Sequence, residues 1–358
     1  MSIDPAALGS SEAARIRSEY ERSLSWRVTR PLRVARGALR RRRSSVAETA
    51  MAEGAGFDSL DSWLDRLYGD RLVAIDEACA RGTGPERLAL FRELDDDVWA
   101  LLLTRQYQRY PNIQALLPDV PAPELQEMWN GLSGVALARQ SRGFYTRLRE
   151  SYERHGPRPL AESSVLDFGC GWGRLTRMLA RDVEPGALYG CDPTQAILGV
   201  CEELGVPATF ARSEFVPARL PFDRRFELAY AFSVFTHLSE RSHRACLQAL
   251  HDALEPGGIL IVTVRPPAFL YANELIAPAR EQVRRDPELI ARASYLFVPH
   301  MAIEQHPQYS GGGEIEYGET VVTLAYVREQ WTQLFELLDV RVQLEDPHQL
   351  MLTLRRPV

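Results

Sequence analysis

A glycine-rich turn carries the strongest chemical signal in the chain. Residues 165–174 read Val-Leu-Asp-Phe-Gly-Cys-Gly-Trp-Gly-Arg, an apolar run followed by Gly169, Gly171 and Gly173 and then by a helical pattern. Glycine lets the backbone turn tightly and lets a ligand approach it at contact distance. The spacing differs from the G-x-G-x-x-G that places a pyrophosphate on a helix N-terminus. Taken alone, the turn still leaves NAD, FAD and plain tight packing open.

A carboxylate ends the next expected strand. Residues 189–193 read Tyr-Gly-Cys-Asp-Pro, which places Asp192 at the tip of that strand. A carboxylate in this position can accept hydrogen bonds from both ribose hydroxyls of an adenosine. The turn and the acid together therefore favour a ligand that contains adenosine.

Short β-rich runs alternate with helical patterns from residue 164 onward, as a parallel α/β sheet requires. The runs are 165–168, 187–191, 208–211, 226–232 and 259–264, and two closing runs, 339–344 and 350–354, follow a helix expected near 327–337. This pattern predicts an α/β, doubly wound sheet, whose ligands bind at the carboxyl edge of the strands.

The length of 358 residues corresponds to roughly two structural units at ~150 residues each. We expect a basic amphipathic or partly disordered arm at 1–50, a helical region at 51–123 and the α/β domain at 124–358. Within that domain we expect a helical cap at 124–157 and an insertion at 266–320.

Composition excludes several classes of protein. The chain contains no lysine, so PLP Schiff bases, P-loop ATPases and lysine-dependent kinases are excluded. Five cysteines without a C-x-x-C pair argue against a disulfide framework and a zinc knuckle. No apolar run approaches the ~18 residues of a membrane span and the N-terminus has no apolar signal core, so we expect a cytoplasmic protein.

Four segments in order resemble class I S-adenosylmethionine-dependent methyltransferases. They are 167–173, the acid Asp192, 226–238 (Phe-Glu-Leu-Ala-Tyr-Ala-Phe-Ser-Val-Phe-Thr-His-Leu) and 254–260 (Leu-Glu-Pro-Gly-Gly-Ile-Leu). The resemblance covers about residues 125–355. It implies a Rossmann-like seven-stranded sheet, with the preceding helical region beside it, and S-adenosyl-L-methionine as cofactor.

The resemblance also assigns residues to the cofactor. The backbone of 169–171 would face its methionine part, Asp192 its ribose, and Ser213 or Glu214 its adenine amine. Phe232 would pack near the cofactor, or it is an ordinary core aromatic. The full expected set is Asp167, Gly169, Cys170, Gly171, Gly173, Asp192, Pro193, Ser213 and Phe232.

His237 is the expected catalytic residue. Methyl transfer requires an aligned nucleophile and, for a hydroxyl, removal of its proton. In the sugar O-methyltransferases that residues 226–238 resemble, a histidine in this loop serves as the base. In relatives with other chemistry a histidine here organises the loop, and that alternative stays open.

Other candidates are weaker. His300, Glu304 and His306 could hold a metal or serve a substrate loop, although such spacing is common by chance, and we expect no metal. The run 311–313 could be a lid hinge or a flexible surface loop. We expect His243 and His251 on the surface of the helix after the fourth strand.

The basic arm suggests the acceptor. Residues 12–43 hold eleven arginines and three glutamates, which gives the segment a charge of +8 and the rest of the chain −14. Residues 23–33 resemble a short segment of bacterial surface-polysaccharide glycosyltransferases and methyltransferases. This resemblance implies a sugar hydroxyl of a cell-surface glycan, or of its lipid-linked precursor, as acceptor.

The alternatives are methylation of a small metabolite or lipid and a non-catalytic scaffold in a glycan-assembly complex. The arm would contact the inner face of the plasma membrane or a glycosyltransferase, or it is a solvated tail. We expect no nucleic acid, because the rest of the chain is acidic. The oligomeric state stays open.

Overall fold

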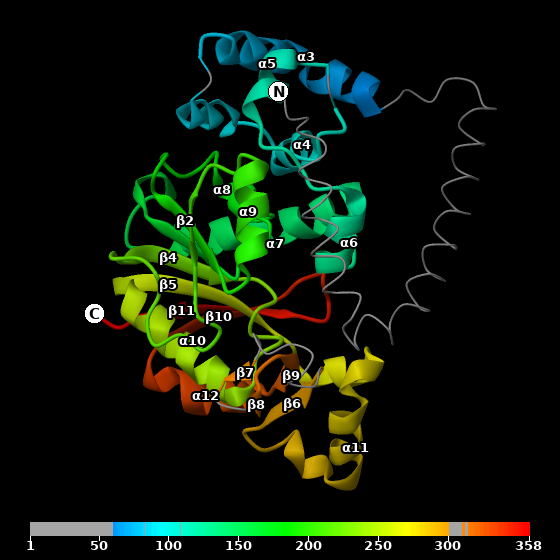
Figure 1. Ribbon diagram of the computed structural model, residues 1–358, viewed down its shortest axis with the longest axis vertical. Helices are drawn as coiled ribbons and strands as arrows, with labels where there is room; N and C mark the ends of the chain where they lie inside the picture. Colours follow the sequence, from blue (N-terminus) through cyan, green and yellow to red (C-terminus); the bar gives the residue numbers. More distant parts are fainter. Residues whose placement is uncertain (1–59, 83, 108, 301–309, 312–313) are drawn as a thin grey trace, which may run out of the picture.

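The structure is a computed structural model that describes residues 60–358, apart from 83, 108, 301–309 and 312–313. The basic arm expected at 1–50 lies outside the described residues. The N-terminal helices lie at one end of the molecule, the sheet lies in the middle, and the insertion with α11 lies at the other end (Figure 1).

Seven strands form the central sheet, in the order β10-β11-β5-β4-β1-β2-β3. Only β11 runs antiparallel to its neighbours β10 and β5. The strands are β1 (Val165–Phe168), β2 (Leu188–Asp192), β3 (Thr209–Arg212), β4 (Phe226–Ala231), β5 (Leu254–Val264), β10 (Glu336–Val342) and β11 (Leu350–Arg355). The α/β fold with a doubly wound, Rossmann-like seven-stranded sheet is therefore confirmed.

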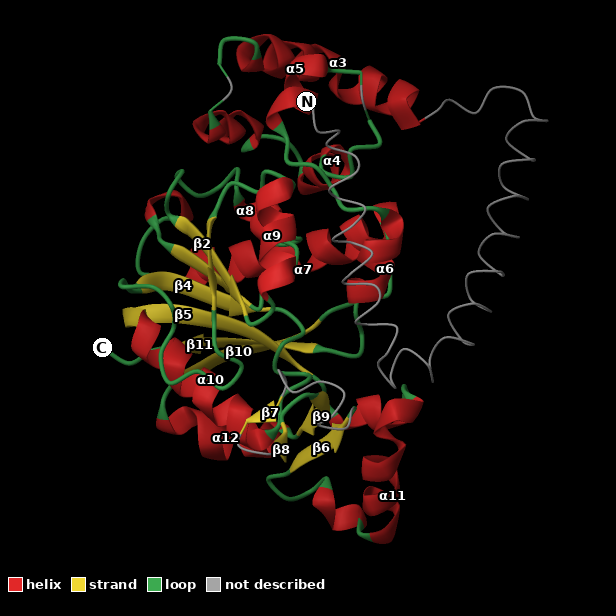
Figure 2. Ribbon diagram, viewed as in Figure 1, coloured by secondary structure: helices red, strands yellow, loops and turns green. Residues whose placement is uncertain are grey.

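Helices cover both faces of the sheet (Figure 2). Every residue of β1 and β4 is buried, as expected for parallel strands packed on two sides. One face packs against α7 (Gly134–His155) and α8 (Thr176–Leu179), and the other packs against α10 (Glu240–Ala253) and α12 (Leu324–Gln330). Helix α9 (Gln195–Glu203) contacts β2 and β3.

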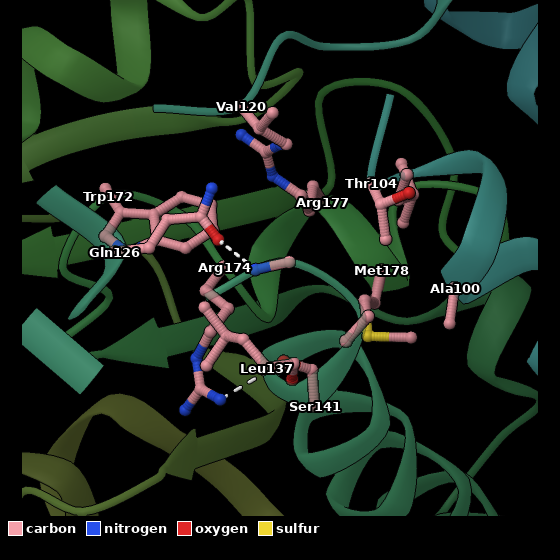
Figure 3. Close-up of a pocket in the computed structure, with 13 residues that line it drawn as sticks. Ala100, Thr104, Val120, Gln126, Leu137, Ser141, Trp172, Arg174, Arg177 and Met178 are labelled. Atoms are coloured by element: carbon pink, nitrogen blue, oxygen red, sulfur yellow. Dashed lines mark hydrogen bonds between the residues drawn. The ribbon is translucent and has the colours of Figure 1, made fainter. Parts of the chain in front are cut away.

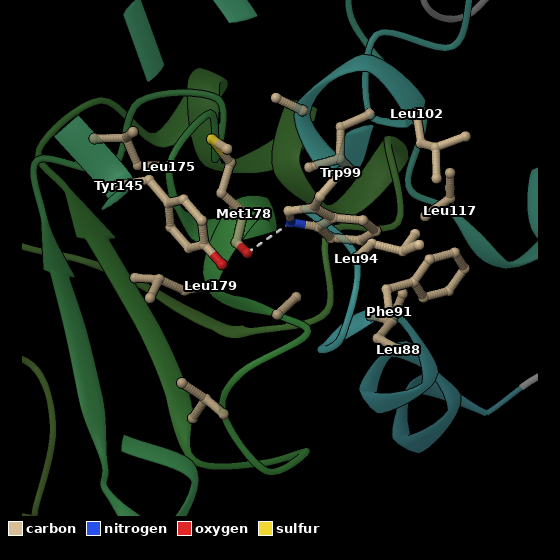
Figure 4. Close-up of a cluster of buried hydrophobic side chains, with 14 of the residues drawn as sticks. Leu88, Phe91, Leu94, Trp99, Leu102, Leu117, Tyr145, Leu175, Met178 and Leu179 are labelled. Carbon is tan, nitrogen blue, oxygen red and sulfur yellow. Dashed lines mark hydrogen bonds between the residues drawn. The ribbon is translucent and has the colours of Figure 1, made fainter. Parts of the chain in front are cut away.

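The N-terminal helices share one hydrophobic core with the sheet. They are α3 (Leu60–Cys79), the 3₁₀ helix η1 (Pro85–Phe91), α4 (Asp96–Leu102) and α5 (Pro111–Leu116). The indole of Trp99 is buried beside Phe91 and donates a hydrogen bond of 2.9 Å to the Met178 carbonyl (Figure 4). The helical region is thus packed directly on the helix that follows the glycine turn.

A buried arginine ties the same two parts together. Arg181 is fully buried, and its guanidinium donates to the carbonyls of Phe91 and Leu94 at 3.1 and 2.9 Å. It also donates to the Tyr145 hydroxyl at 2.9 Å and pairs with Asp96. These bonds connect η1 and α4 with α7 and the end of α8.

Two expected helices are interrupted in the structure. The helical cap expected at 124–157 divides into α6 (Pro123–Asn130) and α7, because Gly131 adopts a left-handed conformation with φ of 71° and ends α6. The helix expected near 327–337 ends earlier: α12 is followed by the 3₁₀ helix η7 (Trp331–Gln333), and β10 begins at Glu336.

The insertion builds a small layer at the carboxyl edge of the sheet. It contains η3 (Pro267–Tyr271), η4 (Glu274–Ile276), α11 (Ala277–Arg285), η5 (Pro287–Leu289), β6 (Tyr295–Pro299), β7 (Ser310–Gly311), β8 (Glu314–Ile315) and β9 (Gly318–Val322). Strands β6 and β9 pair antiparallel. The amides of Gly318 and Thr320 donate to the carbonyls of His237 and Thr236, which joins β9 to the loop after β4.

The described helices include none that is both long enough and apolar enough to cross a membrane.

Candidate functional site

The glycine turn after β1 has a backbone that requires glycine. Gly169, Gly171 and Gly173 have φ values of 74°, 53° and 76°, which lie in the left-handed region. The amides of Gly169 and Cys170 donate to the Cys191 carbonyl at 2.7 and 3.1 Å, which fixes the turn against β2. A Cβ added at Gly171 would meet nothing closer than 3.9 Å, so a ligand can lie against the backbone there.

Asp192 stands at the end of β2, where the sequence places it. Its Oδ1 accepts from the Thr194 amide at 2.9 Å, and its Oδ2 accepts from the Gly171 amide at 3.2 Å. Each oxygen keeps a second lone pair, which suits the two hydroxyls of a ribose. Burial raises the pKa of Asp192 to about 6. The donor set therefore fits an adenosine ribose.

The neighbouring expected residues lie around this carboxylate. Pro193 follows it directly, and the amide of buried Ser213 donates to the Asp192 carbonyl at 3.2 Å. Ser213 thus lies beside Asp192, whereas the alternative residue Glu214 has an exposed side chain. Cys170 is buried within the turn.

Asp167 lies behind the turn. Its Oδ2 accepts from the Thr176 hydroxyl at 2.6 Å, and Thr176 is the first residue of α8. Burial raises the pKa of this carboxyl to about 6, and the hydrogen bond from Thr176 opposes that shift. The observed contacts of Asp167 therefore hold the turn and the following helix together.

Phe232 follows β4 and is half-buried between an aromatic ring and a cation. Its ring lies edge-on to Phe144 at 4.8 Å, and the guanidinium of Arg174 lies 4.8 Å from its centroid. Arg174 donates to Gln140 Oε1 at 2.9 Å and to Ser141 Oγ at 3.1 Å. Burial lowers the pKa of Arg174 to about 10. No pattern in the sequence singled out this cation, although it directly follows the third glycine.

His237 lies in the loop after β4 and is held on both ring nitrogens. Its Nδ1 is 2.8 Å from the Gly318 carbonyl, and its Nε2 is 3.3 Å from Arg265 Nη2. A guanidinium can only donate, so Nε2 is the acceptor and Nδ1 carries the proton. Tyr317 stacks on the ring at 5.2 Å. Burial first, and then Arg265 and His300, lower the pKa of His237 well below its ordinary value.

A cluster that the sequence did not reveal surrounds His237. Potential ligand atoms of His237, His300 and Glu319 lie within 4.8 Å of one another. His300 Nε2 is 2.8 Å from Glu319 Oε1, and the second carboxylate oxygen pairs with Arg265. Two histidines and a carboxylate are a donor set that transition metals accept. Here Arg265 already supplies a positive charge to Glu319 and occupies His237 Nε2.

The sequence grouped His300 with Glu304 and His306, and both of these partners lie outside the described residues. Residues 312–313 of the expected hinge also lie outside them. No spacing in the sequence could have paired His300 with Glu319, because the pairing depends on β6 and β9 folding against each other.

The expectation for His243 is wrong: the side chain is fully buried, with Tyr295 Oη at 2.9 Å from its Nδ1. It shares the buried face of α10 with Cys246, Leu247 and Leu250.

Comparison with protein families and curated proteins adds independent information. Residues 165–258 match a family model described as a methyltransferase domain. The ubiquinone biosynthesis O-methyltransferase of Methylobacterium sp. (strain 4-46) is 33% identical over 109 residues, which are 29% of this chain and 41% of the relative. The trans-aconitate 2-methyltransferase of Variovorax paradoxus (strain S110) is 31% identical over 117 residues, 32% of this chain and 44% of the relative. The chain thus spans less than half the length of these relatives.

Solved structures of similar shape include an S-adenosylmethionine-dependent methyltransferase from Clostridium acetobutylicum ATCC 824. It is 13% identical, with a TM-score of 0.43, and the match covers 66% of this chain and 97% of that chain. A second, from Mesorhizobium loti, is 17% identical with a TM-score of 0.40, and covers 60% of this chain and 98% of that chain.

The family match covers the glycine turn, Asp192 and His237, and the strand order places all three at the same edge of the sheet. The turn and Asp192 fit an adenosine-containing cofactor. Residues 165–258 therefore form a methyltransferase domain of the class I, S-adenosylmethionine-dependent type.

Proposed function

We propose that the chain transfers the methyl group of S-adenosylmethionine to a sugar hydroxyl of a bacterial cell-surface glycan or of its lipid-linked precursor. The observation that carries the methyl-transfer part is the buried Asp192 carboxylate beside the Gly171 amide, within the matched methyltransferase domain. The bound cofactor would supply an electrophilic methyl group on a sulfonium. The acceptor part rests on the resemblance of residues 23–33 and on the position of His237.

In this proposal the cofactor is held at three points. Asp192 accepts from the ribose hydroxyls, with Pro193 and Ser213 beside it. The backbone of Gly169, Cys170, Gly171 and Gly173 faces the methionine part, and Asp167 keeps that turn in place. Phe232 packs against the cofactor, and the neighbouring guanidinium of Arg174 offers a positive charge to the methionine carboxylate.

His237 is proposed as the base that takes the proton of the acceptor hydroxyl. Its low pKa keeps the ring neutral at neutral pH, so Nε2 has a lone pair for the proton. In the structure Arg265 donates to that lone pair, so the acceptor hydroxyl must replace the guanidinium before proton transfer. The Nδ1 bond to the Gly318 carbonyl keeps Nε2 turned toward Arg265.

A second candidate acceptor is a small metabolite or a lipid. The specific observation in its favour is that the relatives described above are named for ubiquinone biosynthesis and for trans-aconitate. A non-catalytic scaffold for glycan assembly is the remaining alternative. We also propose that this protein is cytoplasmic and that its arm contacts the inner face of the membrane or a glycosyltransferase. We propose no role for it in nucleic-acid binding.

The test has two stages. Calorimetric titration with S-adenosylmethionine and S-adenosylhomocysteine needs no knowledge of the acceptor, and we expect micromolar binding of both. Transfer of a labelled methyl group to glycan, metabolite and lipid fractions then separates the acceptor classes. Absence of cofactor binding by folded protein would refute methyl transfer, and labelling confined to metabolites or lipids would refute the sugar acceptor.

A further inference from the structure

A cavity lies behind the glycine turn, between the helical region and the methyltransferase domain (Figure 3). It has a volume of about 40 Å³, and its walls include Thr104 of the helical region, Gln126 of α6, Ala138 of α7, and Trp172 and Arg177 next to the turn. A water position needs ~10–15 Å³, so the cavity accommodates roughly three or four heavy atoms. Asp192, Ser213 and Phe232 do not line it.

Arg177 is the unusual side chain of this cavity. It is only 2% exposed, yet none of its three guanidinium nitrogens has a hydrogen-bond partner among the described residues. The guanidinium lies over the Trp172 ring at 4.9 Å. Burial lowers the pKa of Arg177 to about 9, so the group stays protonated at neutral pH. A buried charge without an acceptor is unfavourable.

The rest of the lining does not compensate this charge. Among the described residues no lining side chain is acidic, and a second cation, Arg174, lines the same cavity. The charge of Asp119 raises the pKa of Arg177 somewhat, but Asp119 forms its ion pair with Arg105, at 3.0 Å. Each neutral polar side chain of the lining already has a hydrogen-bond partner: Thr104 donates to the Leu101 carbonyl, and Gln126 and Ser141 also donate to backbone carbonyls. Water could occupy the guanidinium donors, but it would not balance the positive charge of Arg177.

We propose that this cavity is a binding site for a small carboxylate monoanion of three or four heavy atoms, held by the guanidinium of Arg177. A planar carboxylate matches the parallel N–H donors of a guanidinium. The anion would connect the helical region with the turn, because Leu103 and Thr104 of that region line the cavity together with Trp172, which stands between Gly171 and Gly173. The cavity shares Arg174 with the proposed cofactor site, but Arg177, the residue that would hold the anion, belongs to the cavity alone.

The experiment is thermal unfolding of the full chain in increasing sodium formate, with ionic strength held constant by sodium MES, whose anion is too large for the cavity. We expect the midpoint to rise by about 2 °C once formate exceeds its dissociation constant tenfold. Arg177→Met should abolish the rise. The matched control is Arg284→Met on α11, where the side chain is 73% exposed, and its rise should equal that of the wild type.

A second variant covers the case in which Arg177→Met does not fold. Ala138→Met keeps the arginine and fills the cavity, so it too should remove the response to formate. An unchanged midpoint in the wild type would mean that water alone occupies the cavity. Equal shifts in wild type and variants would mean a general salt effect, and competition between formate and S-adenosylhomocysteine would place the anion in the cofactor site. Each of these results would overturn the proposal.

Discussion

Replacing Asp192 by alanine should separate cofactor binding from folding. The carboxylate would accept one hydrogen bond from each of two ribose hydroxyls, and bonds to a charged acceptor contribute ~1.5–3 kcal/mol each. Taking the lower figure for both bonds gives a loss of about 3 kcal/mol. At 1.4 kcal/mol per tenfold change, the dissociation constant should rise by roughly 100-fold.

Stability should respond differently. Burial raises the pKa of Asp192 from its ordinary 3.8 to about 6, so the ionised form costs the fold about 3 kcal/mol at neutral pH. Alanine removes that cost but leaves the Gly171 and Thr194 amides without their acceptor. The two effects oppose each other, and we expect the free energy of unfolding to change by less than about 1.5 kcal/mol.

Stability and cofactor affinity should change in opposite directions as the pH falls. Between pH 6 and 4 the folded protein binds a proton at Asp192 that the unfolded chain does not, so this group stabilises the fold as pH falls. Asp167, with a pKa also near 6, acts in the same direction. Cofactor affinity should fall over the same range, because a protonated Asp192 can no longer accept from both hydroxyls.

Calorimetry with S-adenosylhomocysteine, combined with denaturant unfolding, measures both quantities on the same sample. Asp223→Ala is the control, since Asp223 is exposed in the loop before β4. An Asp192→Ala protein that is folded and binds S-adenosylhomocysteine within threefold of the wild type would refute the ribose assignment. Loss of binding accompanied by unfolding would refute the claim that the carboxylate serves the ligand more than the fold.

Three further outcomes are expected. His237→Gln should bind S-adenosylhomocysteine normally and turn over ~10²–10⁴-fold more slowly, and unchanged turnover on the true acceptor would leave only a loop-organising role. Arg181→Met should lower the free energy of unfolding by ~3–5 kcal/mol because Asp96 and two carbonyls lose their buried donor, whereas Arg284→Met should change it little. Gly169→Ala should abolish cofactor binding, because the φ of this residue is 74° and the added Cβ would meet Val234. The control is Gly186→Ala, where φ is 83° but the added Cβ would meet no atom within 4 Å, so only backbone strain destabilises the variant. Similar unfolding and binding curves for the two variants would contradict this prediction.

Much of the sheet could be predicted from the sequence, because buried parallel strands are short apolar runs. The run 165–168 coincides with β1, and the next three strands differ from their predicted bounds by one residue at one or both ends. Strand β5 begins five residues earlier than predicted, at Leu254. The turn residues and Asp192 were accessible for the same reason: both lie within a few residues of an identifiable strand.

What the sequence could not provide depends on contacts between distant segments. Arg265 and Glu319 are 54 positions apart and meet only because β9 returns to the loop after β4. His243 appeared exposed because a polar residue on a helix is usually a surface residue, yet it faces the aromatic residues Phe235 and Trp331. The domain boundaries at 50, 123 and 124 stay a prediction.

The two additions to the sheet act on different parts of the candidate site. The helical region contacts the segment after the glycine turn through Trp99 and Arg181, whereas the insertion holds His237 through the Gly318 carbonyl, and Arg265, directly after β5, contacts the other ring nitrogen. The matched segment, residues 165–258, contains neither the cation that lowers the pKa of His237 further, after burial, nor the carbonyl that orients its ring, because Arg265 and Gly318 lie beyond residue 258. If His237 is the base, we therefore expect the choice of acceptor to depend on residues outside the matched segment.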